Sequence, residues 1–104
     1  MVKEYDLVIV GGGTGGYVAA LRASQLGMKT AVVEKGKLGG TCLHSGCIPS
    51  KTLLKSAKVF KTVKDSFQYG ILAQQPVLDF PKVMERKKAI IDRLHKGIQY
   101  LLKR

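Results

Sequence analysis

The sequence predicts an α/β fold in which a βαβ unit is followed by two long helices. Three observations lead to this prediction. An apolar, β-branched run stops at a cluster of glycines, a second such run follows a helical pattern, and the second half contains two long stretches with helical periodicity. The chain has 104 residues, which is one small domain at most, with a thin margin of stability.

Strand, helix and strand make up the first part of the chain. Residues 5–10, "YDLVIV", form a continuous apolar run and predict a buried strand. Residues 14–26, "TGGYVAALRASQL", predict a helix that Gly27 is placed to end. Its apolar face is expected to contain Val18, Leu21 and Gln25 or Leu26. Residues 29–34, "KTAVVE", predict a second strand, parallel to the first.

The second part is predicted to be mainly helical. Residues 48–64 predict a helix. The side chains that it is expected to turn toward the core are Leu53, Leu54, Ala57, Phe60 and Val63. Residues 65–81 contain Gly70, Pro76 and Pro81 and predict a connector, with room for a short extended piece. Residues 82–102 predict a long helix with one apolar stripe, made of Val83, Ile90, Ile91, Leu94, Ile98 and Leu101.

The charge is strongly basic, with a formal net value of +11. Residues 82–104 carry eight Lys or Arg against Glu85 and Asp92. Such a stretch can bind nucleic acid, but it lacks interleaved aromatic residues and matches no DNA-binding motif, so a solvated helix face is the favoured interpretation. Residues 7–10 are too short an apolar run for a signal peptide, and we expect a cytoplasmic protein without a membrane span.

A glycine-rich loop lies between the first strand and the first helix. In "GGGTGG", Gly11, Gly13 and Gly16 give the spacing G-x-G-x-x-G, which permits a tight turn, close approach to a pyrophosphate and close packing of helix on strand. The phosphates would lie at the helix N-terminus. Glu34 ends the second strand, where a carboxylate accepts hydrogen bonds from an adenosine ribose. This acid favours FAD or NAD over NADP, and the simpler alternative is a glycine-rich turn with a surface glutamate.

Cys42 and Cys47 are the only cysteines, five positions apart in "GGTCLHSGCIPSK". In a cytoplasmic protein such a pair is more often catalytic, redox-active or metal-binding than structural. Zinc needs about four ligands, and the other candidates are His44 and the distant His95, so we expect no metal site. The thioredoxin motif has two residues between its cysteines, whereas four lie here. Two interpretations of the cysteines remain. They are either two unrelated buried thiols or a dithiol that cycles to a disulfide.

A disulfide between these two cysteines would need an irregular backbone. In a regular helix, residues i and i+5 are about 7.5 Å apart along the axis, whereas a disulfide needs Cα atoms within about 7 Å. Gly46 and Pro49 suit a distorted helix start. The helix dipole lowers the pKa of a thiol at that position and makes it a better nucleophile. Lys51 lies on the same helix face as Cys47, or is simply one lysine among many.

Together these motifs resemble the flavin-dependent pyridine nucleotide-disulfide oxidoreductases. The resemblance rests on "GGTCLHSGCIPSK", "VIVGGGTGGYVAALRASQLG" and "VVEK" and covers essentially the whole chain. The residues of these motifs are most similar to those of the family members that oxidise dihydrolipoamide. Glutathione, trypanothione and mercuric reductases share the cysteine spacing but usually carry "VPKK" or "VPSK" where this chain has "IPSK". The resemblance implies that residues 1–104 form the N-terminal part of a Rossmann-like FAD-binding domain.

The resemblance also implies roles for individual residues. Cys47 is expected to face the flavin as the charge-transfer thiol, Cys42 to exchange with the substrate, and Lys51 to lie near the reactive flavin nitrogen. In that chemistry dihydrolipoamide attacks the disulfide, electrons pass through Cys47 to FAD, and NAD collects the hydride. The implied cofactor-binding residues are Gly11, Gly13, Thr14, Gly16, Glu34, Lys35, Gly40, Thr41 and Lys51.

Members of this family are homodimers with further segments. The resemblance implies dihydrolipoamide on the lipoyl domain of an acyltransferase as substrate, within a 2-oxo acid dehydrogenase complex. It places the rest of the FAD domain, the NAD domain and a dimerisation domain outside this sequence, and neither His44 nor His95 matches the catalytic histidine of the dimerisation domain. We therefore expect a fragment that is inactive alone. The alternatives are a non-catalytic FAD- or ADP-binding module, another flavin disulfide reductase such as glutathione or mercuric reductase, and a helical interaction protein that uses residues 82–102.

Overall fold

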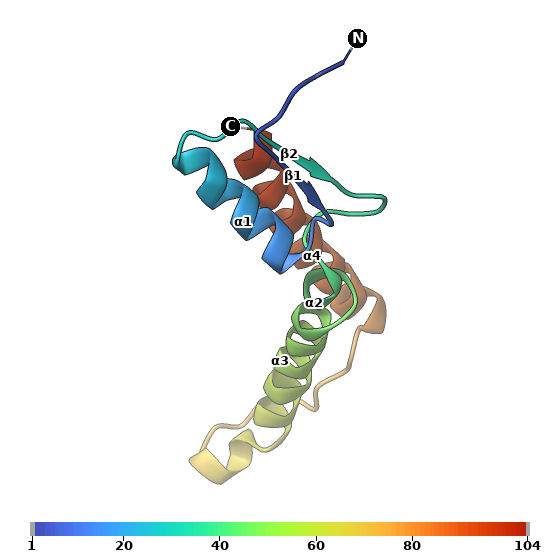
Figure 1. Ribbon diagram of the computed structural model, residues 1–104. Coiled ribbons are helices and arrows are strands. Elements are labelled where there is room, and N and C mark those ends of the chain that lie inside the picture. The colour runs from blue at the N-terminus through green and yellow to red at the C-terminus, as the bar shows by residue number, and fades with distance from the viewer. Residues whose placement is uncertain (1, 104) are drawn as a thin grey trace.

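The protein is an elongated molecule with a βαβ unit at one end and a helical hairpin that projects from it (Figure 1). The computed structural model describes residues 2–103. Its elements are β1 (Leu7–Val10), α1 (Thr14–Gln25), β2 (Thr30–Val33), α2 (Thr41–His44), α3 (Cys47–Lys64), the 3-10 helix η1 (Ser66–Tyr69) and α4 (Phe80–Lys103). The described chain measures 67 × 25 × 19 Å with a radius of gyration of 20.2 Å. A compact domain of this length would have a radius of gyration of about 13 Å.

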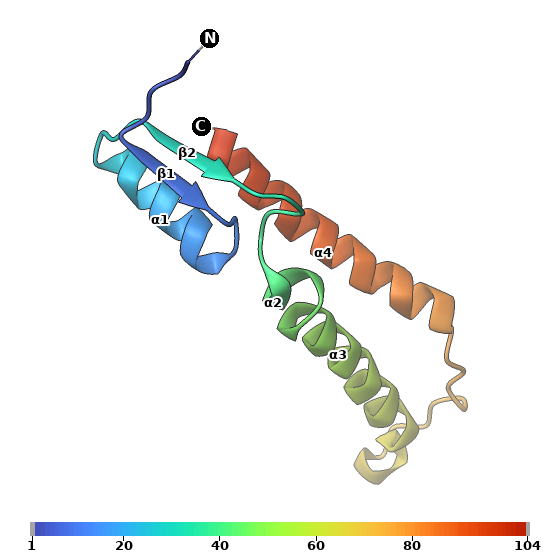
Figure 2. The same ribbon diagram turned by 45° about the vertical axis from the view of Figure 1, so that its right-hand side comes forward.

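The two strands pair in parallel, as predicted, and α1 covers one face of them (Figure 2). The register runs from Leu7 opposite Thr30 to Val10 opposite Val33. Both strands are shorter than the predicted ranges 5–10 and 29–34. Just before β1, the Asp6 N–H donates to the Lys29 carbonyl at 2.8 Å, and the Lys29 N–H donates to the Asp6 carboxylate at 2.8 Å. These bonds fix the entry to the sheet.

The prediction of a buried first strand is wrong for one of its two faces. Side chains along β1 alternate between half-buried and exposed, and Val10 is 86% exposed. Successive side chains of a strand point to opposite faces, and α1 covers only one of them. The continuous apolar run therefore belongs to a sheet whose second face is open in the described part of the chain.

Helix α1 packs through alanines rather than through the predicted apolar stripe. Ala20 and Ala23 are 4% and 6% exposed, whereas Val18 is 54% exposed and Leu26 is also exposed. Small side chains let the helix axis lie close to a sheet of two short strands, which the longer side chains would prevent. The predicted face was therefore wrong at Val18 and Leu26, while Leu21 is half-buried as expected.

The end of α1 follows the prediction that Gly27 stops the helix. Gly27 has a φ of +86°, in the left-handed region. Its N–H donates to the Ser24 carbonyl at 3.0 Å, and the Met28 N–H donates to the Ala23 carbonyl at 3.1 Å. This pair of bonds is a Schellman motif, which satisfies the last carbonyls of the helix and turns the chain toward β2.

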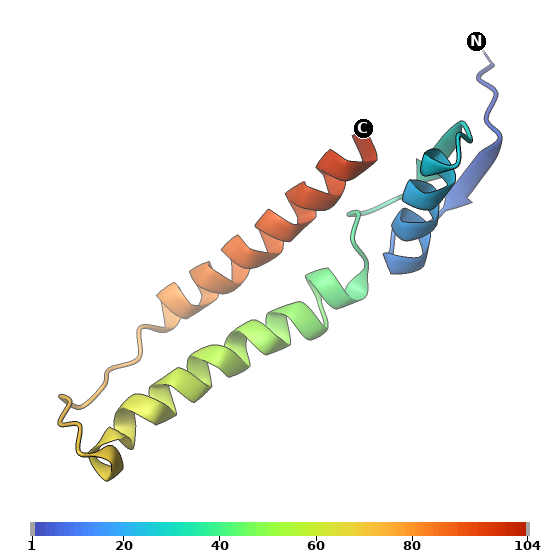
Figure 3. The same ribbon diagram turned by 90° about the vertical axis from the view of Figure 1, so that its left-hand side faces the viewer.

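Helices α3 and α4 run antiparallel and form the projecting hairpin, as Figure 3 shows. The connector predicted for 65–81 contains η1, and residues 71–79 form no strand. Helix α4 begins two residues before the predicted start, at Phe80. The Asp79 carboxylate accepts the Lys82 N–H at 3.2 Å and so caps the new helix, with Pro81 in its first turn.

The contact between these helices is narrower than predicted. Leu53 and Phe60 of α3 are half-buried, but Leu54 is 67% exposed, and Ala57 and Val63 are exposed as well. In α4, Leu94 and Leu101 are exposed, whereas the other stripe residues are half-buried. A single partner helix covers only a narrow stripe, so the flanking apolar positions stay open.

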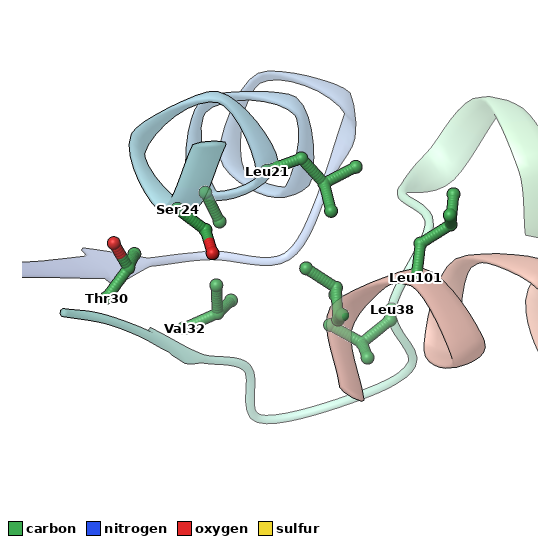
Figure 4. Close-up of a pocket in the computed structure, with 8 residues that line it drawn as sticks. Leu21, Ser24, Thr30, Val32, Leu38 and Leu101 are labelled. Atoms are coloured by element: carbon green, nitrogen blue, oxygen red, sulfur yellow. The ribbon is translucent and has the colours of Figure 1, made fainter. Parts of the chain in front are cut away.

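The C-terminal end of α4 returns to the βαβ unit. A cavity of about 230 Å³ lies between α1, β2 and this end of α4, and Figure 4 shows Leu21, Val32, Leu38 and Leu101 around it. Within residues 2–103, no helix is both long and apolar enough to cross a membrane.

Candidate active site

The glycine-rich loop between β1 and α1 forms the first part of the site. Gly11 has a φ of +105°, which a glycine adopts most easily. A Cβ on Gly16 would overlap the Gly11 carbonyl oxygen and lie 3.0 Å from the carbonyl carbon. The start of α1 therefore packs directly against the loop, as a close helix–strand contact requires.

The N-terminus of α1 can accept an anion. Gly13 is the N-cap and makes no side-chain capping bond, and the first turn contains no acidic residue. The first N–H groups of a helix have no partner inside the helix, and the dipole favours negative charge there. Thr14 lies at this position with an exposed side chain.

Glu34 joins the end of β2 to the glycine-rich loop. Its carboxylate accepts the Gly12 N–H at 2.5 Å and the Gly36 N–H at 3.0 Å. The hydrogen bond from Gly12, then that from Gly36, and the charge of Lys35 lower the pKa of this carboxyl. A carboxylate has about four acceptor positions, so two bonds from the backbone leave room for ribose hydroxyls.

Residues 36–40 bring the next segment back to the glycine-rich loop. The Gly39 N–H donates to the Gly12 carbonyl at 2.9 Å. A Cβ on Gly40 would lie 3.2 Å from the Gly13 Cα, so the two backbones are in close contact. Gly40 and Thr41 therefore lie beside Gly13, next to the predicted pyrophosphate position.

Cys42 and Cys47 form a disulfide, with their Cα atoms 4.9 Å apart. The predicted irregular backbone is confirmed, because Cys42 lies in the short helix α2 and Cys47 begins α3 after a break at Ser45 and Gly46. A Cβ on Gly46 would lie 3.1 Å from the Cys42 Cα and 3.2 Å from the Thr41 carbonyl oxygen. The absence of a side chain at Gly46 lets the two helices approach closely enough for the bond.

The disulfide lies close to the N-terminus of α1. Cys42 is exposed and Cys47 is half-buried. Cys42 and Thr14 line one cavity of about 260 Å³, whose other residues are mainly apolar: Tyr17, Gly39, Leu43, Ile48, Leu94 and Ile98. The structure thus brings the glycine-rich loop, Glu34, the 36–40 segment and the disulfide together. Lys35 and Lys51 have exposed side chains, on the residue after Glu34 and one turn beyond Cys47.

Sequence reasoning missed two histidine contacts. His44 and His95 were considered only as metal ligands or catalysts, yet both rings contact the Leu38 carbonyl oxygen at 2.8 Å. Among residues 2–103 no group of three or more His, Cys, Asp or Glu side chains could hold a metal ion. The position of His44 between the two cysteines could have indicated a role for this residue at the disulfide. Nothing in the sequence, however, pairs His44 with a residue of α4.

The family model for pyridine nucleotide-disulphide oxidoreductases matches residues 5–104, which is almost the whole chain. The chain belongs to this family. Its curated relatives include proteins named dihydrolipoyl dehydrogenase. That of Bacillus subtilis is 60% identical over 104 residues, and that of Acholeplasma laidlawii is 52% identical over 105 residues. A third, from Zymomonas mobilis, is 44% identical over 104 residues.

Each of these three alignments covers 100% of this chain. The chain spans only 22% of the Bacillus and Zymomonas proteins and 31% of the Acholeplasma protein. The family membership agrees with the partial Rossmann-like fold that the sequence predicted.

The site fits the dinucleotide cofactor that the family uses. The glycines bring backbone against backbone at the start of α1, because a Cβ on Gly16 or Gly40 would press on neighbouring backbone atoms. Close packing of this kind is typical of a dinucleotide-binding turn. The anchored carboxylate of Glu34 suits a ribose with free hydroxyls. A 2′-phosphate would bring like charge against it.

Proposed function

We propose that this chain supplies the N-terminal part of the FAD-binding domain of a dihydrolipoyl (dihydrolipoamide) dehydrogenase. The reaction is the transfer of two electrons from dihydrolipoamide through the Cys42–Cys47 disulfide and FAD to NAD. The observation that carries the proposal is a disulfide with an exposed Cys42 in a cavity shared with Thr14 of the phosphate-binding turn. The names of the relatives support the choice of substrate.

The chain holds the cofactor through its backbone and one carboxylate. Gly11, Gly13 and Gly16 leave the N-terminus of α1 open to the pyrophosphate, and the helix dipole stabilises its charge. Glu34 would accept hydrogen bonds from the ribose hydroxyls, while the Gly12 and Gly36 N–H groups hold its carboxylate in place. Bound FAD supplies a two-electron acceptor beside the dithiol, with NAD as the onward acceptor.

Thiol exchange begins at Cys42 because its side chain is exposed whereas that of Cys47 is half-buried. One substrate thiolate attacks the Cys42 sulfur, the bond to Cys47 breaks, and Cys47 leaves as a thiolate. The second substrate thiolate then attacks the substrate sulfur of this mixed disulfide. The substrate closes to its cyclic disulfide, and Cys42 leaves as the second thiolate, so the protein has gained two electrons.

The start of α3 stabilises the thiolate that leaves first. Cys47 is the first residue of α3, and the first turn of this helix contains no acidic side chain. The positive end of the helix dipole therefore favours the anionic sulfur. Lys51, one turn further along, would lie near the reactive nitrogen of the flavin in this proposal.

The partners that we propose follow from the same assignment. The substrate would be dihydrolipoamide carried on the lipoyl domain of an acyltransferase, and the protein would act as a homodimer within a 2-oxo acid dehydrogenase complex.

The two cysteine-to-serine variants of the full-length protein that contains these residues, loaded with FAD, test the proposal. Cys42→Ser should leave Cys47 as a thiolate beside oxidised flavin, and so give a long-wavelength charge-transfer band without lipoamide turnover. Cys47→Ser should lose both the band and the turnover. A band that survives Cys47→Ser and vanishes in Cys42→Ser would reverse the two roles.

Limited alkylation of the reduced wild-type protein provides an independent measurement. With less than one equivalent of iodoacetamide, Cys42 should carry most of the label, because it is the exposed thiol. Predominant labelling of Cys47, located by peptide mass spectrometry, would contradict the assignment.

A further inference from the structure

The Leu38 carbonyl oxygen is bonded by two histidine rings from different parts of the fold. His44 Nε2 and His95 Nδ1 each lie 2.8 Å from it. A carbonyl oxygen has two lone pairs and no proton, so both rings must donate. Their tautomers are thereby fixed, with the proton on Nε2 of His44 and on Nδ1 of His95. The rings meet edge to face, with centroids 4.9 Å apart. We call these two rings and the carbonyl the histidine clasp.

The histidine clasp joins three segments of the site. His44 lies in α2, inside the loop that the disulfide closes. His95 belongs to α4 and is 57 positions from Leu38 in the sequence. The residue after Leu38 is Gly39, whose N–H donates to the Gly12 carbonyl at 2.9 Å. The clasp therefore connects the redox loop, the long helix α4 and the glycine-rich loop.

The histidine clasp is closely packed on the side of Gly39. Gly39 is buried, with a φ of +120°. A Cβ there would lie 3.3 Å from His44 Nε2 and 3.4 Å from Ile98 Cδ1, and would overlap the Leu43 side chain. The backbone at Gly39 is thus shaped to bring the Leu38 carbonyl to both rings. Such close packing distinguishes the clasp from a chance surface contact.

We propose that His44 and His95 are positioning residues for the redox pair, and that the histidine clasp sets the thiol–disulfide equilibrium of Cys42 and Cys47. The proposal rests on the proposed function, because it concerns the same two thiols. His44 lies between the cysteines, so holding its ring to Leu38 restricts the loop to shapes in which the sulfurs can meet. The clasp should therefore favour the disulfide.

The reason is the conformational freedom of the reduced loop. Without the disulfide, only Ser45 and Gly46 link α2 to α3. Each unrestricted residue lowers the effective concentration of one thiol near the other. A clasp bond that is stronger in the oxidised form shifts the equilibrium toward the disulfide by its differential strength. One hydrogen bond of ordinary net strength corresponds to about a three- to tenfold change in the equilibrium constant.

The two rings use different nitrogens, which gives a matched set of variants. The amide nitrogen of Asn superposes on Nδ1 of histidine, and that of Gln on Nε2. His95→Asn and His44→Gln therefore keep the donor of the clasp, whereas His95→Gln and His44→Asn misplace it. Each conservative variant serves as the control for the other variant at its position.

The equilibrium is measured in the full chain, with dithiothreitol and its cyclic disulfide in varied ratio at fixed pH. In this exchange dithiothreitol loses two electrons and closes to a ring, while Cys42 and Cys47 become two thiols. Alkylation and mass spectrometry count the thiols. His95→Gln and His44→Asn should be reduced more readily, by about three- to tenfold. His95→Asn and His44→Gln should stay within about twofold of wild type.

If the thiol–disulfide equilibrium constant were the same in all four variants and in wild type, the proposed role of the histidine clasp would be overturned, but the proposed function would not. If the cysteines did not cycle with dithiothreitol at all, both would be overturned. The ring tautomers of the folded wild-type protein are measured as well, by ¹H–¹⁵N correlation spectroscopy of the imidazoles, so that the test does not depend on the variants. A proton on Nε2 of His44 and on Nδ1 of His95 supports the clasp, and the opposite tautomer on either ring overturns it.

Discussion

Two neighbouring glycines at the start of α1 should respond to alanine in opposite directions. A Cβ on Gly15 meets nothing within 4 Å, whereas a Cβ on Gly16 overlaps the Gly11 carbonyl. Both residues are helical, so both substitutions gain helix propensity, which is worth about 0.5–1 kcal/mol. Only Gly16→Ala also introduces a clash.

The size of the clash follows from the atoms involved. The Gly11 carbonyl belongs to the backbone of a tight turn and cannot rotate away as a flexible side chain would. Overpacking costs about 1–3 kcal/mol, and rigid neighbours place Gly16→Ala at the upper end. After subtraction of the propensity gain, Gly16→Ala should destabilise the fold by about 2 kcal/mol, roughly a thirtyfold change in the unfolding equilibrium.

Urea unfolding of the full chain, followed by far-UV circular dichroism, measures both variants against wild type. Gly15→Ala should unfold at slightly higher urea than wild type, and Gly16→Ala at clearly lower urea, with a difference of about 3 kcal/mol between them. If Gly16→Ala were as stable as Gly15→Ala, then α1 would not pack on the glycine-rich loop as described, and the argument for a phosphate-binding turn would fail.

Two further predictions concern the carboxylates of Glu34 and Asp79. The pKa of Glu34 is lowered in the fold, so its contribution to stability is present above its ordinary pKa of 4.5 and is lost as the pH falls below that value. Glu34→Gln should therefore be less stable than wild type at neutral pH, and this difference in the free energy of unfolding should narrow as the pH falls below 4.5. A difference that is the same at every pH would exclude the carboxylate as its source. Asp79→Ala removes the cap of α4 and should lower the free energy of unfolding by about 1 kcal/mol. The control Asp92→Ala, in the middle of the same helix, should lower it by less. Equal losses of stability would show that the cap bond contributes nothing.

The local elements could be predicted because their signals are local. Glycines mark the end of α1 and the tight turn between β1 and α1, and Gly46 between the cysteines predicted the break that lets the disulfide form. Helix α4 extends two residues further toward the N-terminus than predicted because Asp79 caps it, a signal that was present in "LDFP" but not used.

Burial and long-range contacts could not be predicted in the same way. Periodicity identifies the apolar face of a helix, but it does not show how much of that face a neighbouring element covers. Leu54 and Val18 were therefore expected in the core, although both are exposed. The close packing of α1 through Ala20 depends on the sheet having only two short strands in the described residues, and no local sequence pattern encodes that. The two histidines meet at Leu38 only because α4 returns along the βαβ unit.

The length of the helical hairpin makes the two ends of α3 unequal in local stability. At one end α3 starts at the disulfide and packs on α2. At the other it leads into η1 and residues 71–79, where nearly every side chain is exposed. Segments with few buried contacts open at low free-energy cost, so amide hydrogen exchange should be fastest at this tip and slow down progressively toward Cys47. The hairpin can therefore fray from its far end while the disulfide stays closed, so that opening of the tip leaves the loop between Cys42 and Cys47 intact.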